Sequence, residues 1–266
     1  MNISLAAEPI FHIGSFPVTN TLMVAWVIVL FLILVVFLTR RKLREVPRGL
    51  QNVVETVIEG ALNFMETITG DRKQAKKFFP IVFTIFIFVI LSNWIEIVPG
   101  LGTIGLWEEH GGEKILIPFI RSSSADLNLT LAIAIFSVLS TQIFGIAALG
   151  FSKYGGKFLP FKGLFKIKYG FLPAPSFNGF IAFFAGFLEL IAEVAKFVSF
   201  SSRLFGNIFA GEVLLLVVSF LVPYIVPLPF LFLEIFVGFV QALVFAMLTL
   251  VFLKMAVTGH EVEEAH

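Results

Sequence analysis

The sequence contains no cysteine, which excludes disulfides, thiolate metal sites, iron–sulfur clusters and cysteine nucleophiles. Charged residues are also scarce, at 14% of the chain, whereas roughly 25% is usual in soluble proteins. The net charge of +1 leaves no basic excess that would favour nucleic acid as a partner. The four histidines lie in predicted loops or tails without metal-ligand spacing, and neither a Ser–His–Asp set nor a phosphate-binding glycine loop is visible. We therefore expect no catalytic site, no metal and no cofactor.

Apolar side chains, by contrast, are in large excess. Hydrophobic residues make up 58% of the 266 residues, phenylalanine alone occurs 34 times, and the mean hydropathy is +0.97. So many large apolar side chains cannot all be hidden in one soluble core of this size. The sequence therefore predicts an all-α membrane protein with the lipid bilayer as its solvent and about five to six membrane helices.

The apolar runs and the basic loops between them predict a single integral membrane domain over residues 1–266. Lysines and arginines gather after the first and the third run, which makes these loops cytoplasmic by the positive-inside rule. No lysine or arginine precedes the first run, so we expect a retained helix rather than a cleaved signal peptide. The expected segments are an external N-terminus (1–20), a span (21–39), a cytoplasmic segment with an amphipathic helix (40–77), a span (78–98), an external loop (99–125), a span (127–151), a cytoplasmic loop (152–178), a tilted helix region (179–226), a last span (230–253) and a cytoplasmic tail (254–266).

Two of these segments depart from a simple spanning helix. Apolar residues between Val53 and Met65 recur every three or four positions, which predicts an amphipathic helix along the membrane surface. The run from Gly179 to Val226 covers 48 residues. As one helix it would measure ~72 Å, more than twice the thickness of the hydrocarbon layer. We therefore expect this run to be broken, strongly tilted or both, and the membrane helices to include a long, strongly tilted helical hairpin.

Ionisable residues inside the apolar runs are costly in hydrocarbon, so they are expected to face a bundle interior or a water cavity. They are Glu189, Glu193, Lys196, Arg203 and Glu212 in the long run and Glu234 in the last span. At about 100° per residue, the first four share one helical stripe with Asn207, which needs a polar or aqueous neighbour. Glu212 lies about 140° away from this stripe, on another face. Glu234 and Gln241 form a second track, about 20° apart on the last span.

The stripe has both a structural and a functional interpretation. Glu193 and Lys196, at a spacing of three, can simply neutralise each other, and both interpretations fit this pair equally well. Arg203 has no opposite charge three or four residues away, so its partner must come from elsewhere and a functional role is favoured. Gly206 and Ala210 are small residues four apart, a spacing more typical of close helix packing than of a ligand site.

The segment from Ser201 to Glu212 reads Ser-Ser-Arg-Leu-Phe-Gly-Asn-Ile-Phe-Ala-Gly-Glu. It resembles the hallmark segment of the a subunit of rotary F-type ATP synthases, the ATPase A chain family that forms the stator of the membrane sector. The resemblance extends along most of the chain. It includes residues 47–51, 93–100, 124–130 and 241–253.

The resemblance implies a static, non-catalytic membrane subunit with two aqueous half-channels beside a rotating ring of carboxylate-bearing c subunits. Arg203 matches the essential arginine that couples ion translocation to rotation. Asn207, Glu212 and Gln241 match polar residues of the external half-channel, and Glu189 matches a carboxylate on the cytoplasmic side.

Glu234 stands where family members often have histidine, and the resemblance places it with Glu212 in the external half-channel. The implied partners are the c-subunit ring, the peripheral-stalk b subunits and the lipid bilayer of a bacterial plasma membrane. Two alternatives come from other functional classes. One is a self-contained secondary transporter that binds its substrate among the buried charges. The other, with much less support, is an intramembrane enzyme that uses Glu212 and Glu234 as acid and base.

Overall fold

The computed structural model describes residues 8–40, 49–98, 104–110, 113–158, 167–169, 172–174 and 177–258. Its helices are α1 Asn20–Arg40, α2 Leu50–Thr69, α3 Arg72–Ile97, α4 Leu127–Leu149, α5 Phe151–Phe158, α7 Phe177–Leu221 and α8 Pro227–Thr258, with a single 3₁₀ turn described, η2, at Ser123–Ala125. Antiparallel hairpins pair β1 Pro9–Ile13 with β2 Phe16–Thr19, β3 Gly105–His110 with β4 Glu113–Pro118, and β5 Ile167–Tyr169 with β6 Leu172–Ala174.

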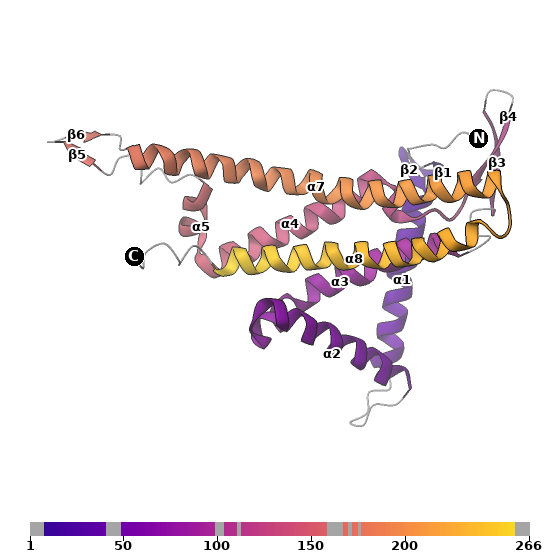
Figure 1. Ribbon diagram of the computed structural model, residues 1–266, viewed down its shortest axis with the longest axis horizontal. Helices are drawn as coiled ribbons and strands as arrows, with labels where there is room; N and C mark the ends of the chain where they lie inside the picture. The colour runs from indigo at the N-terminus through magenta and orange to yellow at the C-terminus, as the bar shows by residue number, and fades with distance from the viewer. Residues whose placement is uncertain are drawn as a thin grey trace.

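Among the described residues, the five helices α1, α3, α4, α7 and α8 are long and apolar enough to cross a membrane. The expected all-α membrane fold is therefore confirmed. The strands form short two-stranded ribbons in the segments that connect or precede the long helices (Figure 1). Strands of three to six residues are too short to leave a periodic pattern that a sequence analysis would detect.

The longest element is a hairpin of α7 and α8. α7 is one unbroken helix of 45 residues, and at 1.5 Å per residue it is ~67 Å long. From the turn at residues 222–226, α7 and α8 run side by side and then diverge toward the far end, where α5 stands between α7 and the end of α4 (Figure 1). Because the hydrocarbon layer is about 30 Å thick, α7 must be strongly tilted in it. Tilt, and not a break, accommodates the long apolar run.

α2 is the expected amphipathic helix, and a network of charges fixes its junction with α3. Asp71 caps α3 by accepting hydrogen bonds from backbone N–H groups of the first turn. Arg72 forms ion pairs with Glu59 (2.6 Å) and Glu66 (3.0 Å) on α2. α3 therefore begins at Arg72 and not at Phe78, where the apolar run starts, so its first turns carry basic residues.

The core lies where α3, α4, α7 and α8 meet. One apolar cluster in it is built around Ile85, Val89, Ile90, Phe200, Leu204, Ile208, Ala242 and Phe245. A second cluster brings in α2, with Met65, Phe78, Val82, Ala246, Leu250 and Leu253. Inside the core, a hydrogen bond of 2.7 Å joins the hydroxyls of Ser137 on α4 and Thr249 on α8. The core therefore locks α8 against both α3 and α4.

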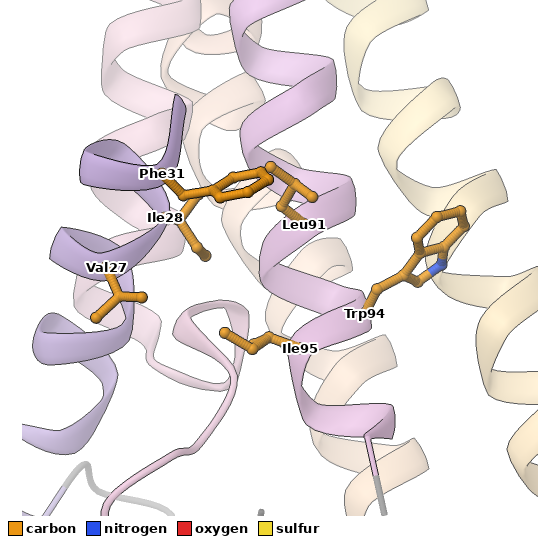
Figure 2. A pocket seen from close by; sticks show the side chains of 6 residues that line it. All are labelled: Val27, Ile28, Phe31, Leu91, Trp94 and Ile95. Atoms are coloured by element: carbon orange, nitrogen blue, oxygen red, sulfur yellow. The ribbon is translucent and has the colours of Figure 1, made fainter. Parts of the chain in front are cut away.

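α1 stands at the edge of the bundle and leaves an apolar groove of about 340 Å³ against α3 (Figure 2). The groove is lined by Val27, Ile28, Phe31, Leu91, Trp94 and Ile95. The indole of Trp94 points away from α1 and toward α8 (Figure 2). There its Nε1 donates a hydrogen bond to the carbonyl of Ile235 (3.1 Å). A groove of this composition suits hydrocarbon chains and not ions, so the candidate site has to be sought among the polar side chains.

Candidate functional site

α7 has two faces of different composition. Phe200, Ser201, Leu204, Ile208 and Gly211 are buried against the bundle, at the three- and four-residue spacing of a packed helix face. The other side includes a row of exposed small side chains, which we call the small-residue face: Ala192, Ala195, Ser199, Ser202, Gly206 and Ala210. A Cβ added at Gly206 would meet no heavy atom within 4 Å. Small residues in such a row allow another helix to approach closely in a membrane.

Arg203 projects from this small-residue face. Its side chain is exposed, and its Nη2 donates a hydrogen bond of 3.3 Å to the Oγ of Ser199, one turn earlier. Within the described ranges, no carboxylate forms an ion pair with its guanidinium. A cation inside an apolar span is stable only beside an anion, other polar groups or water. The surroundings that Arg203 requires must therefore come from outside the described part of this chain.

Glu212 lies on another face of α7, as the helical geometry predicts, and it is paired with Arg121. The Nη2 and the Nε of Arg121 donate to the Oε2 of Glu212 over 3.0 and 3.3 Å. The two side chains are only 7% and 18% exposed, so loss of either partner leaves a largely buried charge behind. The pair ties α7 to the segment that precedes α4.

A buried layer of serines supports the segment that carries Arg121. The hydroxyl of Ser122 donates to the carbonyl of Ser92 on α3 (3.0 Å), and the hydroxyl of Ser124 donates to the Oγ of Ser92 (3.2 Å). Asp126 caps α4 and also accepts a hydrogen bond from the hydroxyl of Thr21 on α1 (2.9 Å). Three helices therefore hold this segment in place, and with it the guanidinium of Arg121.

Glu234 on α8 faces Gly211 on α7. A Cβ on Gly211 would overlap both carboxylate oxygens of Glu234, so the missing side chain is what makes room for the carboxyl group. Because Gly211 directly precedes Glu212 in the chain, Glu234 and the Arg121–Glu212 pair lie in the same region of the bundle. Glu234 therefore packs against the turn of α7 that carries Glu212.

Further polar groups continue from this region along α8. The Nδ2 of Asn93 on α3 donates a hydrogen bond of 3.0 Å to the carbonyl of Gly238. The Oδ1 of Asn93, the Oγ of Ser123 and the Nε2 of Gln241 are buried without a hydrogen-bond partner among the described residues. Buried polar atoms are normally bonded to protein or to internal water. An internal water beside these atoms would satisfy them.

The remaining predicted residues lie toward the opposite end of α7. The Nζ of Lys196 donates to Glu193 over 2.5 Å, so the pairing that their spacing of three allows is present. Glu193 also accepts a hydrogen bond from Gln142 on α4 (2.8 Å). Glu189, one turn away, is half-buried. The stripe predicted from the sequence therefore splits into an exposed part at Arg203 and a part that is held against α4.

Sequence reasoning missed Arg121, although a signal for it was present. Arg121 and Lys114 are the only arginine and lysine between 99 and 125, and Glu212 has no cation three or four residues away on its helix. A carboxylate in an apolar span needs a counter-charge, so these two cations were the ones to consider. Asn207, predicted to share the stripe of Arg203, is half-buried.

A profile of the ATP synthase A chain family matches residues 21–254. The chain belongs to this family. The ATP synthase subunit a of Moorella thermoacetica is 32% identical over 251 residues, which cover 94% of this chain and 96% of the relative. That of Campylobacter jejuni is 34% identical over 257 residues, with 96% and 91% covered. That of Geobacter sulfurreducens is 31% identical over 244 residues, with 91% and 86% covered.

Membership in the ATP synthase A chain family confirms the resemblance seen between Ser201 and Glu212. The chain is therefore a membrane-sector subunit of an ATP synthase, associated with other subunits of that complex and with the membrane. It takes part in ATP synthesis and ion transport as a multi-pass membrane protein. The family favours this assignment over a self-contained transporter or an intramembrane enzyme.

Proposed function

We propose that this chain is the proton-channel stator of the ATP synthase membrane sector. It provides two aqueous half-channels, and Arg203 couples ion translocation to rotation of the c-subunit ring. The observation that carries the proposal is the exposed guanidinium of Arg203 on the small-residue face of α7. A ring of carboxylate-bearing subunits seated on this face would supply the anion that the arginine needs.

The chemistry of the guanidinium group suits this role. Arginine keeps its proton at any cellular pH, so it offers a fixed positive charge and cannot itself relay a proton. A ring carboxylate that reaches Arg203 is held ionised, after it has released its proton to one half-channel and before it is reloaded from the other. Arg203 therefore attracts each carboxylate and also blocks direct proton flow between the two half-channels. Ion flow then requires rotation.

The external half-channel is proposed to pass between α7 and α8. Its residues are Asn207, Glu212, Glu234 and Gln241. The partly buried pair of Glu212 with Arg121 supports this route, because a charged pair is more easily maintained beside water than in lipid. The interior atoms that lack a hydrogen-bond partner among the described residues support it as well, because an internal water can satisfy such groups.

The cytoplasmic half-channel is proposed to lie at the other end of α7, with Glu189 as its carboxylate. This orientation keeps the basic segments 40–77 and 152–178 inside and the N-terminus and the loop 99–125 outside. Parts of these segments lie outside the described residues, as do the residues of the cytoplasmic tail beyond 258. The bacterial sources of the relatives support a bacterial plasma membrane as the location.

The proposed partners are the c-subunit ring on the small-residue face and the peripheral-stalk b subunits elsewhere on the chain. Chemistry on ATP would take place in other subunits, so this chain is non-catalytic. A membrane potential of about 100 mV contributes ~2.3 kcal/mol for each elementary charge that crosses. Several ions per turn can therefore sum to the free energy that ATP formation requires.

The test is Arg203→Lys in membrane vesicles that contain the whole complex. Lysine is a point charge on a different stem and can lose its proton when it is desolvated, whereas arginine cannot. We therefore expect no proton-driven ATP synthesis with Arg203→Lys, although the complex still assembles. Arg40→Lys makes the same change at the end of α1, outside the proposed half-channels, and is expected to retain the normal rate of ATP synthesis. Near-normal synthesis with Arg203→Lys would contradict the proposal.

A further inference from the structure

At the end of the hairpin that is far from the α7–α8 turn, α5 stands between α7 and the end of α4 (Figure 1). Side-chain hydrogen bonds join these three helices. The hydroxyl of Tyr154 donates to the Oε1 of Gln142 (2.6 Å). The Nε2 of Gln142 donates to one carboxylate oxygen of Glu193 (2.8 Å), and the Nζ of Lys196 donates to the other (2.5 Å). Lys196 also lies 4.3 Å from the ring centroid of Phe252 on α8. Four helices therefore meet at this network.

The turn between α4 and α5 puts Tyr154 in place. Gly150 adopts a φ of 80°, which favours glycine, and its carbonyl accepts a hydrogen bond of 3.0 Å from the N–H of Tyr154. The Tyr154 ring packs directly on α4, because a Cβ on Gly145 would overlap it. Tyr154 is 4% exposed. Its hydroxyl thus has little freedom other than to reach Gln142.

Each hydrogen bond in this network has a fixed donor and a fixed acceptor. Burial, together with the charges of Glu193 and Glu189, raises the pKa of Tyr154 to about 12. The hydroxyl therefore keeps its proton at cellular pH and remains a donor. Gln142 must then turn its amide oxygen toward Tyr154 and its NH₂ group toward Glu193, since the reverse would set an oxygen against a carboxylate. With Lys196 on the other side, both oxygens of Glu193 face donors, and the carboxylate has one orientation.

We propose that Tyr154 is a positioning residue for ion release: as a permanent donor it orients Gln142, which holds Glu193 and the α7 segment that carries Glu189. This inference rests on the proposed function, in which Glu189 lines the cytoplasmic half-channel. Glu189 and Glu193 are about 6 Å apart along the helix axis and on the same side of α7. Anchoring Glu193 to α4 therefore sets where Glu189 stands relative to the ring, and proton transfer is sensitive to small displacements.

Tyr154→Phe tests the inference with little risk to the fold. It removes the hydroxyl and keeps the ring that packs on Gly145. Tyr224→Phe is the matched control, because it makes the same change at a side chain that is 87% exposed in the α7–α8 turn. In vesicles with the whole complex, Tyr154→Phe is expected to slow proton-driven ATP synthesis by about threefold to tenfold, as for the loss of one buried hydrogen bond. Tyr224→Phe is expected to leave the rate unchanged.

A double-mutant cycle separates positioning from general packing. If Tyr154 acts on Glu193 through Gln142, the double variant Tyr154→Phe with Glu193→Gln should be no slower than the slower single variant. ¹³C NMR gives a second readout, in a complex where only this chain carries labelled tyrosine. The chain has three tyrosines, and the signal of Tyr154 is identified by its loss in Tyr154→Phe. Glu193→Gln and Gln142→Met are both expected to shift that signal and to leave the signal of Tyr224 in place.

Equal rates for Tyr154→Phe and Tyr224→Phe would overturn the inference. So would losses that multiply in the double variant, or a Tyr154 signal that does not respond to Glu193→Gln. The variant Arg203→Lys distinguishes these failures from failure of the proposed function. Normal synthesis with Arg203→Lys contradicts the stator proposal itself. Absent synthesis with Arg203→Lys, together with normal synthesis in Tyr154→Phe, contradicts only the role of Tyr154.

Discussion

Gly211 on α7 leaves the space that the carboxyl group of Glu234 on α8 occupies, since a Cβ there would overlap both carboxylate oxygens. The two residues belong to different arms of the hairpin. The position of a carboxylate proposed to line the external half-channel is therefore set by a missing side chain on the neighbouring helix. Backbone flexibility does not explain this glycine, because it lies inside a regular helix.

Gly211→Ala is predicted to displace Glu234 and to interrupt proton entry. A misplacement of about 1 Å in a proton-transfer site can cost on the order of a hundredfold in rate. Proton-driven ATP synthesis and passive proton uptake in vesicles measure the effect. Gly60→Ala is the control, because a Cβ on this α2 glycine meets nothing within 4 Å. Adding Glu234→Asp, which shortens the carboxylate side chain, should recover part of the lost rate. A normal rate in Gly211→Ala would contradict the assigned path.

The Arg121–Glu212 pair is predicted to contribute to stability as well as to transport. Arg121→Met leaves a carboxylate that is 18% exposed without its cation, and breaking a buried pair costs about 3 kcal/mol. Thermal unfolding of the detergent-solubilised complex should therefore show a clear loss for Arg121→Met and also for Glu212→Leu. The double variant should be more stable than either single variant, because no charge is left unpaired. If the three variants unfold at the same temperature as the native complex, the pair has no structural role.

Arg203 and Glu234 could be singled out from the sequence as candidate site residues because a charge in hydrocarbon is costly in any arrangement of the helices. The sequence could narrow the partner of Glu212 to Lys114 or Arg121 but could not choose Arg121, since Arg121 and Glu212 are 91 positions apart and no local pattern links them. The same holds for Gln142 and Glu193, which are 51 positions apart. Such contacts depend on which helices pack together, and apolar runs alone do not determine helix packing.

The fold, too, could be predicted from the sequence only in part. The long apolar runs identified the spans, because only a helix of that length satisfies its backbone while it crosses the bilayer. The length of the run from 179 to 226 was equally compatible with a broken helix and with a tilted one. Contacts of α7 with α4, α5 and α8 accompany the unbroken form, and these are tertiary interactions. The short β hairpins depend on local turns and leave no apolar run.

Glu212 and Glu234 are predicted to act together in proton entry. Glu234 faces Gly211, which directly precedes Glu212, so both carboxyl groups belong to the proposed entry path, and either one can accept a proton from outside and pass one inward. Glu212→Gln and Glu234→Gln should each slow passive proton uptake without stopping it, and the double variant should nearly stop it. Because Glu212 also pairs with Arg121 over 3.0 Å, its variant should show the greater loss of thermal stability. Uptake at the native rate in the double variant would contradict the relay.

The last prediction concerns the small-residue face, where a substitution can distinguish contact with a ring from packing within this chain. Gly206 lies beside Arg203 on this face, and a Cβ there meets nothing within 4 Å. Gly206→Leu should therefore leave the fold and thermal stability of the chain unchanged. If the c-subunit ring lies against this face, the added side chain forces the two surfaces apart. Overpacking of this kind costs enough to lower the amount of ring subunit that co-purifies by about tenfold.

Gly60→Leu is the matched control for this experiment, because Gly60 is also exposed and open but lies on α2, away from α7. It should retain both the ring and the rate of ATP synthesis. Normal amounts of ring in the Gly206→Leu complex would mean that the ring lies elsewhere. The assignment of this face to the ring would then have to be abandoned. Arg203 would lack the ring carboxylate that a cation in an apolar span requires.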